Sequence, residues 1–360
     1  MWGLLLTCSI FSMWFGMILP VLEVFIGIVH VLGFFAFLIP MVYLGPRADA
    51  RSVFIQTFNF GGWSDVTMAA FVGLKGTISM FLGTDGVVHM AEEVANSSLV
   101  VPQSMLFAIV INGILGFAMM IAFLFTAGDL SAIVKSQATY PFMQIIQNST
   151  GSQGAAIVLS TLMAVMSVCC GLGGISSGSR MLWAFSRERA IPGWRWVYQL
   201  DQRTAVPFHS TVIIVVTAGL VGLINIGSSE VLSIVLSLTM EAFFFSYIMP
   251  LSLLLYRRIK GDIREPGQDP NKGLTWGPFR VRGLLGILNN IVALVFCSVA
   301  VIFGFWPNEN HPPLSKMNWS SVIFISAVIL AVFYYLGWGR KHYMGPVMEV
   351  QVEERRLEPR

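Results

Sequence analysis

The sequence predicts an all-α integral membrane protein, and three observations support this prediction. Hydrophobic residues make up 55% of the 360 residues and charged residues only 11%, about half of the charged fraction that is usual in soluble domains. The mean hydropathy is +0.73. The apolar residues form runs of about 20 residues, the length of helix that crosses the hydrocarbon core of a bilayer. The net charge of +3 gives no reason to expect a nucleic-acid partner.

Nine apolar segments are expected to span the membrane. They are residues 1–19, 21–45, 66–95, 102–127, 153–186, 207–226, 229–256, 283–306 and 319–338. The fifth exceeds the thickness of the bilayer, so we expect it to tilt or to project beyond the membrane. No linker or low-complexity tract divides the chain. We therefore expect a single membrane domain over residues 1–346 and a short tail over 347–360.

The orientation of the chain follows from its basic residues. Most of the 22 Lys and Arg residues fall after the fifth span, after the seventh span and in the tail, which would all lie on one side of the membrane. Cytoplasmic segments carry such an excess, so the C-terminus is predicted to be cytoplasmic. With nine spans Met1 would then lie outside, so that either one span is miscounted or an odd number of helices precedes the first. The sequons at Asn148 and Asn318 fall on the predicted outer side, and their glycosylation stays open.

The segment richest in polar and ionisable residues is FLGTDGVVHMAEEVANSS, residues 81–98, which begins inside the third predicted span. Gly83 and Gly86 flank Asp85 and allow the backbone to leave helical geometry. A broken helix at membrane depth is tolerated only where it lines a cavity or is buried in protein, and its freed backbone groups can bind a polar ligand. We therefore predict ligand contacts from this break, at Ser79, Gly83, Thr84, Asp85 and Gly86. The alternative is that the glycines only permit close helix packing.

Other ionisable residues in the spans are candidates because a charge inside a bilayer is costly. In the helical part of the same segment, His89 and Glu92 would share a face with Asp85, and Glu93 flanks that face. His30 lies in the middle of the second span, where its imidazole could exchange a proton or simply bond a neighbour. Glu241 lies deep in the seventh span, where a protonated or paired state is expected.

Enzyme chemistry and metal binding find little support in the sequence. The five histidines are widely separated, and the four cysteines lie in apolar segments without metal-ligand spacing. We expect no catalytic residue, no metal site and no cofactor. A membrane enzyme is therefore disfavoured.

Three segments carry a resemblance to a known family. They are FLGTDGVVHMAEEVANSSLVVPQSM, GISSGSRMLWAFSRERAIPGW and INIGSSEVLSIVLSLTMEAFFFSYIMP, at residues 81–105, 174–194 and 224–250. In order and spacing they resemble the fungal amino acid, choline and GABA permeases of the amino acid–polyamine–organocation (APC) superfamily. The resemblance covers the chain to about residue 346. It implies the LeuT-type inverted-repeat fold of twelve helices, N-terminally truncated here, with the nine spans corresponding to the fourth through twelfth helices.

The resemblance also implies a function. It implies transport of amino acids or related amines (choline, GABA or polyamines) by alternating access, coupled to protons, in the plasma membrane. The break at Asp85 matches the sixth family helix, whose unwound centre helps to form the substrate site. The implied partners are a small nitrogenous substrate, protons and the lipid bilayer. The candidates for proton coupling are His30, Asp85, His89, Glu93 and Glu241.

The missing first helix also allows a second interpretation. In the family this helix contributes to binding of the substrate, so the chain could instead be a non-transporting remnant or a sensor derived from such a permease. Its sequence leaves open the substrate, the choice between symport and exchange, and the oligomeric state.

Overall fold

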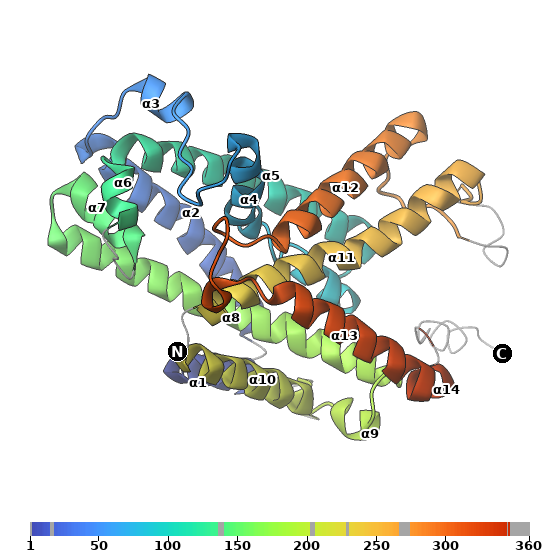
Figure 1. The fold of residues 1–360 in the computed structure, drawn as a ribbon. Helices are drawn as coiled ribbons and strands as arrows, with labels where there is room; N and C mark the ends of the chain where they lie inside the picture. The colour runs from blue at the N-terminus through green and yellow to red at the C-terminus, as the bar shows by residue number, and fades with distance from the viewer. Residues whose placement is uncertain are drawn as a thin grey trace. The chain divides into compact units, whose positions relative to one another are not determined.

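The computed structural model describes residues 2–14, 18–135, 140–201, 206–227, 230–265, 274–343 and 345. These residues are mostly helical (Figure 1), which confirms the predicted fold class. In chain order the elements are α1 (Trp2–Trp14), α2 (Leu19–Leu44), α3 (Ala50–Phe54), α4 (Val66–Ser79), η1 (Gly86–Glu93), α5 (Ser97–Thr126), α6 (Leu130–Lys135), α7 (Pro141–Thr150), α8 (Gln153–Arg187), α9 (Trp194–Val197), α10 (Phe208–Gly227), α11 (Glu230–Lys260), α12 (Gly283–Gly304), η3 (Leu314–Lys316), α13 (Ser320–Tyr334), η4 (Tyr335–Gly339) and α14 (Arg340–His342).

Six stretches of helix are long and apolar enough to cross a membrane. They are Val21–Leu44, Ser97–Thr126, Gln153–Arg187, Val231–Lys260, Gly283–Gly304 and Ser320–His342. The other three predicted spans contain shorter apolar helices, namely Trp2–Trp14, Val66–Ser79 and Phe208–Ile224. The chain is thus a multi-pass integral membrane protein. That nine segments cross the bilayer stays a prediction.

The third predicted span is broken, as the sequence indicated. Asp65 caps the start of α4 by accepting a hydrogen bond from Thr67 N (3.1 Å), and α4 ends at Ser79. After a run of turns the chain continues as the 3₁₀ helix η1. Gly83 has a φ of +85°, a left-handed conformation that glycine adopts without steric cost. The glycine therefore permits the backbone to leave the α-helix at this point.

The second half of this span differs from the α-helical expectation. Hydrogen bonds between residues three apart, Gly86 N to Gly83 O (3.0 Å) and Val88 N to Asp85 O (2.8 Å), wind it as a 3₁₀ helix. In such a helix there are three residues per turn, and residues three apart lie above one another. The faces of an α-helix, which has 3.6 residues per turn, therefore cannot be used to place its side chains. The α-helical winding expected for this part is therefore wrong. His89 Nε2 nevertheless lies 3.8 Å from Asp85 Oδ2, so the closeness of this pair agrees with the expectation. Asn96, with a φ of +53°, then turns the chain into α5.

The chain separates into two compact units. The first contains the described parts of residues 1–19, 171–224 and 325–360. Within it, a Cβ added to Gly219 would lie 2.8 Å from the Trp2 ring and one added to Gly171 would lie 3.3 Å from Cys8 Sγ. Small residues thus let α1 approach α8 and α10 closely, as is usual for helices in lipid.

The second unit contains the described parts of residues 20–170 and 225–324. In it α11 and α12 run side by side (Figure 1), and α4 packs against both. Ile78, Met240, Phe244, Cys297 and Ala300 form the buried core of this group. A second core joins α2, α7 and α8 through Phe37, Ile146, Ala156 and Leu159. The first of these cores holds the end of α4 and thereby positions the break.

Candidate functional site

The break between α4 and η1 lies against two long helices of the second unit. On one side η1 packs on α5. On the other, Leu82 and Tyr247 pack around the buried core of α4, α11 and α12. The irregular backbone therefore has protein on two sides, although no residue of η1 is buried. Protein contact of this kind, or a cavity, is the condition under which a broken helix is tolerated at membrane depth.

Asp85 occupies the end of the break and is paired with two side chains. The Tyr247 hydroxyl of α11 donates a hydrogen bond to Asp85 Oδ2 (3.1 Å). His89 Nε2 lies 3.8 Å from the same oxygen. The Asp85 side chain is 17% exposed and that of His89 30%, so both groups remain within reach of a ligand. A carboxylate beside a phenol and an imidazole can bind a cationic amine or exchange a proton.

A cavity of about 350 Å³ lies beside the break, on its α5 side. Its walls are Met80, Leu82, Gly83, Thr84, Val87, Ser104, Ala108 and Asn112. The Thr84 hydroxyl donates to Phe81 O (3.0 Å), which leaves the hydroxyl oxygen as an acceptor. A Cβ added to Gly83 would meet no atom within 4 Å, so the backbone there is open to a ligand. The lining combines apolar side chains with polar groups, and polar groups that fix the orientation of a ligand between apolar walls are a feature of small-molecule sites.

The residues that were predicted to contact a ligand thus lie in different surroundings. Gly83 and Thr84 line the cavity, whereas Asp85 contacts α11 through Tyr247. Gly86 is half-buried at the start of η1. Ser79 is exposed and donates its hydroxyl proton to Gly76 O of its own helix (2.7 Å), so its side chain belongs to the end of α4.

The candidates for proton coupling also lie in different places. Asp85 and His89 lie close together. His30 is exposed on α2 and takes no part in the hydrogen bonds and ion pairs described around Asp85. Glu93 is exposed at the end of η1. Glu241 is completely buried in α11, six residues from Tyr247 and therefore about 9 Å away along the helix axis.

Glu241 belongs to a polar network between α11, α12 and α13. Ser320 donates a hydrogen bond to Glu241 Oε1 (2.7 Å), and Oε2 is buried without a described partner. The nearby amide of Asn318 donates to Gly304 O (3.0 Å) and, more weakly, to Trp306 O (3.3 Å). Glu241 thus has one hydroxyl as its hydrogen-bond partner, and its protonated or ion-paired state stays a prediction.

Lys75 of α4 contacts the same part of the structure. Its ammonium group donates a hydrogen bond to Trp306 O (2.8 Å), which also accepts from the Asn318 amide (3.3 Å). This lysine thus ties α4 to the same polar network.

Sequence reasoning did not find several of these residues. Tyr247 lies in the aromatic run FFFSYIMP, where nothing distinguishes it from a packing residue. Ser104 and Asn112 are polar residues of an otherwise apolar span, and Asn112, as a lone amide in mid-span, carried a signal that could have been used. Among the described residues no group of three or more His, Cys, Asp or Glu is arranged to hold a metal ion.

Comparisons with known proteins identify relatives of the chain. It is 26% identical over 331 residues to a choline transporter of Saccharomyces cerevisiae, an alignment that covers 91% of this chain and 56% of the relative. It is 25% identical over 354 residues to a GABA-specific permease of the same yeast, with 97% and 57% covered. Amino-acid permease 2 of Neurospora crassa is 23% identical over 299 residues, with 83% and 52% covered. The chain therefore spans about half of the length of these relatives.

The family model for amino acid permeases matches residues 1–332, nearly the whole part of the chain that the structure describes. This match agrees with the resemblance inferred from the motifs, and it favours a transport protein over an enzyme. Together with the apolar helices and the broken span, it shows that the chain belongs to the amino acid permease family.

Proposed function

We propose that this protein carries small nitrogen-containing solutes, amino acids or amines of the choline and GABA type, across the plasma membrane. The observation that carries this proposal is the broken span, where Asp85 is paired with Tyr247 beside a cavity of about 350 Å³. The substrates named for the yeast relatives support the chemical class. Each carries a positively charged nitrogen, which a partly exposed carboxylate attracts electrostatically.

In this proposal the two sides of the break bind different parts of the substrate. Asp85 binds the ammonium group and exchanges one of its present partners for it. The open backbone at Gly83, together with Thr84 and Asn112, binds the polar groups of the remainder. Such a division is the use that carriers make of a discontinuous helix near the bilayer midplane.

In this proposal, proton coupling depends on two carboxyl groups, Asp85 and Glu241, each of which is bonded to a residue of another helix. The Asp85–His89 pair can hold a proton that substrate binding displaces, because both side chains are partly exposed. Glu241 is the second carrier, since it is completely buried and bonded to a helix other than its own. Alternating access would then couple movement of α11 to both carboxyl groups. The C-terminus would face the cytoplasm.

Uptake measurements test this proposal. Labelled choline, GABA and arginine would be offered to a permease-deficient yeast that expresses the chain, and we expect uptake of at least one of them. Asp85→Asn should lower this uptake tenfold or more, because loss of a charge paired with substrate costs about 2–5 kcal/mol. Glu309→Gln is the matched control, since Glu309 forms an exposed ion pair with Lys316 (3.1 Å). Absence of uptake of any amine or amino acid would contradict the function, and normal uptake by Asp85→Asn would contradict the site.

A further inference from the structure

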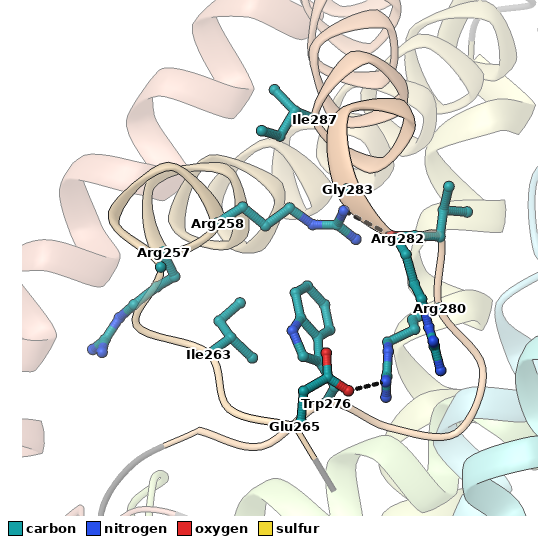
Figure 2. A pocket seen from close by; sticks show the side chains of 11 residues that line it. Arg257, Arg258, Ile263, Glu265, Trp276, Arg280, Arg282, Gly283 and Ile287 are labelled. Carbon is teal, nitrogen blue, oxygen red and sulfur yellow. Dashed lines mark hydrogen bonds and ion pairs between the residues drawn. The ribbon is translucent and has the colours of Figure 1, made fainter.

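A second cavity, of about 220 Å³, lies in the connection between α11 and α12 (Figure 2). It contains an unusual number of arginines for its size. Its lining residues are Arg257, Arg258, Gly261, Ile263, Glu265, Trp276, Arg280, Val281, Arg282, Gly283 and Ile287. The lining includes four arginines and a single carboxylate, although the Arg257 side chain points away from the others (Figure 2). The cavity therefore carries an excess of positive charge that favours an anion.

Two of these arginines are held in fixed positions. Arg258 Nη1 donates a hydrogen bond to Val281 O (2.9 Å), and its guanidinium lies over the Trp276 ring, 4.6 Å from the centroid. The Arg280 side chain is only 7% exposed and forms an ion pair with Glu265 (Figure 2). The groups are therefore ordered by the fold before any ligand arrives, which lowers the cost of binding.

Both arginines keep a donor for which the described residues of the connection supply no acceptor. The Nε atoms of Arg258 and Arg280 are buried and have no described hydrogen-bond partner. A buried donor that stays unsatisfied costs about 1–3 kcal/mol. A ligand with several acceptor oxygens would remove this cost, whereas a cation or an apolar ligand would not.

The start of α12 adds a further attraction for an anion. The helix begins at Gly283, which lines the cavity, and its N-cap residue Arg282 makes no side-chain capping bond. The first N–H groups of a helix have no acceptor within the helix, and this end carries the positive pole of the helix dipole. Phosphate groups commonly bind in such positions.

The position of the cavity indicates that the anion belongs to a lipid. The cavity lies where one candidate span ends at Lys260 and the next begins at Gly283, so it is at the surface of the bilayer. Leu284 and Leu285, at the start of α12, are both 71% exposed, and Ile259 is 68% exposed. Apolar side chains beside a phosphate-binding cavity suit an amphiphile, whose acyl chains would lie along these residues.

We propose that this cavity binds the phosphorylated headgroup of an anionic membrane lipid, such as a phosphoinositide. The phosphate oxygens accept hydrogen bonds from Arg258 and Arg280 and from the first N–H groups of α12. Arginine binds phosphate through two parallel hydrogen bonds. Glu265 competes with the phosphate for Arg280. Because the Glu265 side chain is 61% exposed, it can turn into solvent when the phosphate binds. Basic cavities beside spanning helices on the cytoplasmic side are known to hold such headgroups.

Native mass spectrometry of the purified chain in detergent tests the proposal, with phosphatidylinositol 4-phosphate and phosphatidylcholine as probes. We expect adducts of the first lipid at concentrations where the second gives none. Arg280→Gln should weaken this binding about tenfold or more, since hydrogen bonds to charged groups contribute about 1.5–3 kcal/mol. Glu265→Gln should strengthen it several-fold by removing the competitor. Because these two variants change the affinity in opposite directions, a fold damaged by one of them cannot imitate the expected result.

Lys260→Gln is the matched control for charge. Lys260 lies at the end of α11, with its ammonium over the Tyr256 ring (4.6 Å), and is not part of the cavity lining. Equal losses in Lys260→Gln and Arg280→Gln would show general attraction to a basic surface and would overturn the proposal. Displacement of the lipid by inorganic phosphate at equal concentration would overturn the assignment to a lipid, because the acyl chains would then contribute nothing.

Discussion

At the scale of single residues, the structure gives hydrogen-bond partners to two acids, one in the broken span and one inside an apolar helix. Asp85 accepts from Tyr247, and Glu241 accepts from Ser320. In a bilayer an unpaired carboxylate is costly, so each partner lowers the cost of keeping the acid. The partners differ in exposure, because Asp85 remains partly open whereas Glu241 is completely buried. In the proposed function the first would therefore meet the substrate directly, and the second would act through protons or through the packing of its helices.

The Tyr247 hydroxyl can be tested by Tyr247→Phe. This change keeps the ring in the core and removes the donor to Asp85, and a hydrogen bond to a charged group contributes about 1.5–3 kcal/mol. We expect the apparent substrate affinity in uptake assays to change about tenfold, while the amount of protein in the membrane stays the same. Tyr256→Phe on the same helix is the control, since Tyr256 is 53% exposed. Similar effects of the two changes would argue against a role for the bond.

The Ser320–Glu241 bond is expected to stabilise the packing of α13 on α11. Ser320→Ala leaves both oxygens of a buried carboxyl without a described donor, which should cost about 1–3 kcal/mol. A lower midpoint of thermal unfolding in detergent is the expected result. Ser298→Ala is the control, because Ser298 donates only to Leu294 O of its own helix (2.8 Å). If both variants unfold at the wild-type temperature, the bond does not stabilise the fold.

At the scale of the element, the broken span depends on one backbone conformation. The chain leaves α4 after Ser79 and resumes as a 3₁₀ helix at Gly86. Between them Gly83 has the positive φ. Packing of α4 on α11 and α12 and of η1 on α5 holds the two ends of the break. The break is therefore set by local backbone freedom together with tertiary contacts.

Gly83→Ala tests this dependence. The added methyl group has open space around it, so the cost arises only from the left-handed backbone and should be about 1–2 kcal/mol. We expect reduced thermal stability and reduced uptake together. Gly73→Ala in α4 also has open space and has no positive φ, and it should be neutral or slightly stabilising because alanine favours a helix. Full stability and uptake in Gly83→Ala would show that the break does not need this conformation.

At the scale of the whole molecule, the helices differ in how much of their surface the chain itself covers. In the candidate span Gly283–Gly304, 28% of an apolar stretch of 18 residues is buried inside the chain. The corresponding share is 6% in Val21–Leu44 and in Ser97–Thr126. Large apolar side chains that the chain does not cover are costly in water but not in lipid. The surface of the molecule thus requires a membrane as its solvent.

Glycosylation provides a test of the orientation. Asn148 is exposed on α7, whereas the Asn318 amide is bonded to Gly304 O, and the third sequon residue, Ser320, is bonded to Glu241. If the predicted outer side is correct, glycosylation should occur at Asn148 and not at Asn318. In yeast, Asn148→Gln should abolish the gel shift that endoglycosidase produces, while Asn318→Gln should leave it. A shift that depends on Asn318, or no shift in the wild type, would contradict this prediction.

Part of the candidate site could be predicted from the sequence because it depends on local chemistry. Two glycines around an acid are enough to indicate a break, and the structure has one there. The type of helix after the break was predicted wrongly, since no sequence pattern separates a short 3₁₀ helix from an α-helix. Tyr247 is 162 residues away from Asp85, and no local pattern indicates a contact over that separation.

The sequence alone determined the solvent of this protein, its helical class and its family, because hydropathy, charge distribution and motif spacing are properties of the chain that folding does not alter. Only the tertiary structure decided which partners the buried acids have and where cavities lie. Both depend on which helices pack together, as when Tyr247 reaches Asp85 and Trp276 supports Arg258. Apolar segments in lipid are alike in hydrophobicity, and their packing is therefore selected by shape and by a few polar bonds between residues far apart in the sequence.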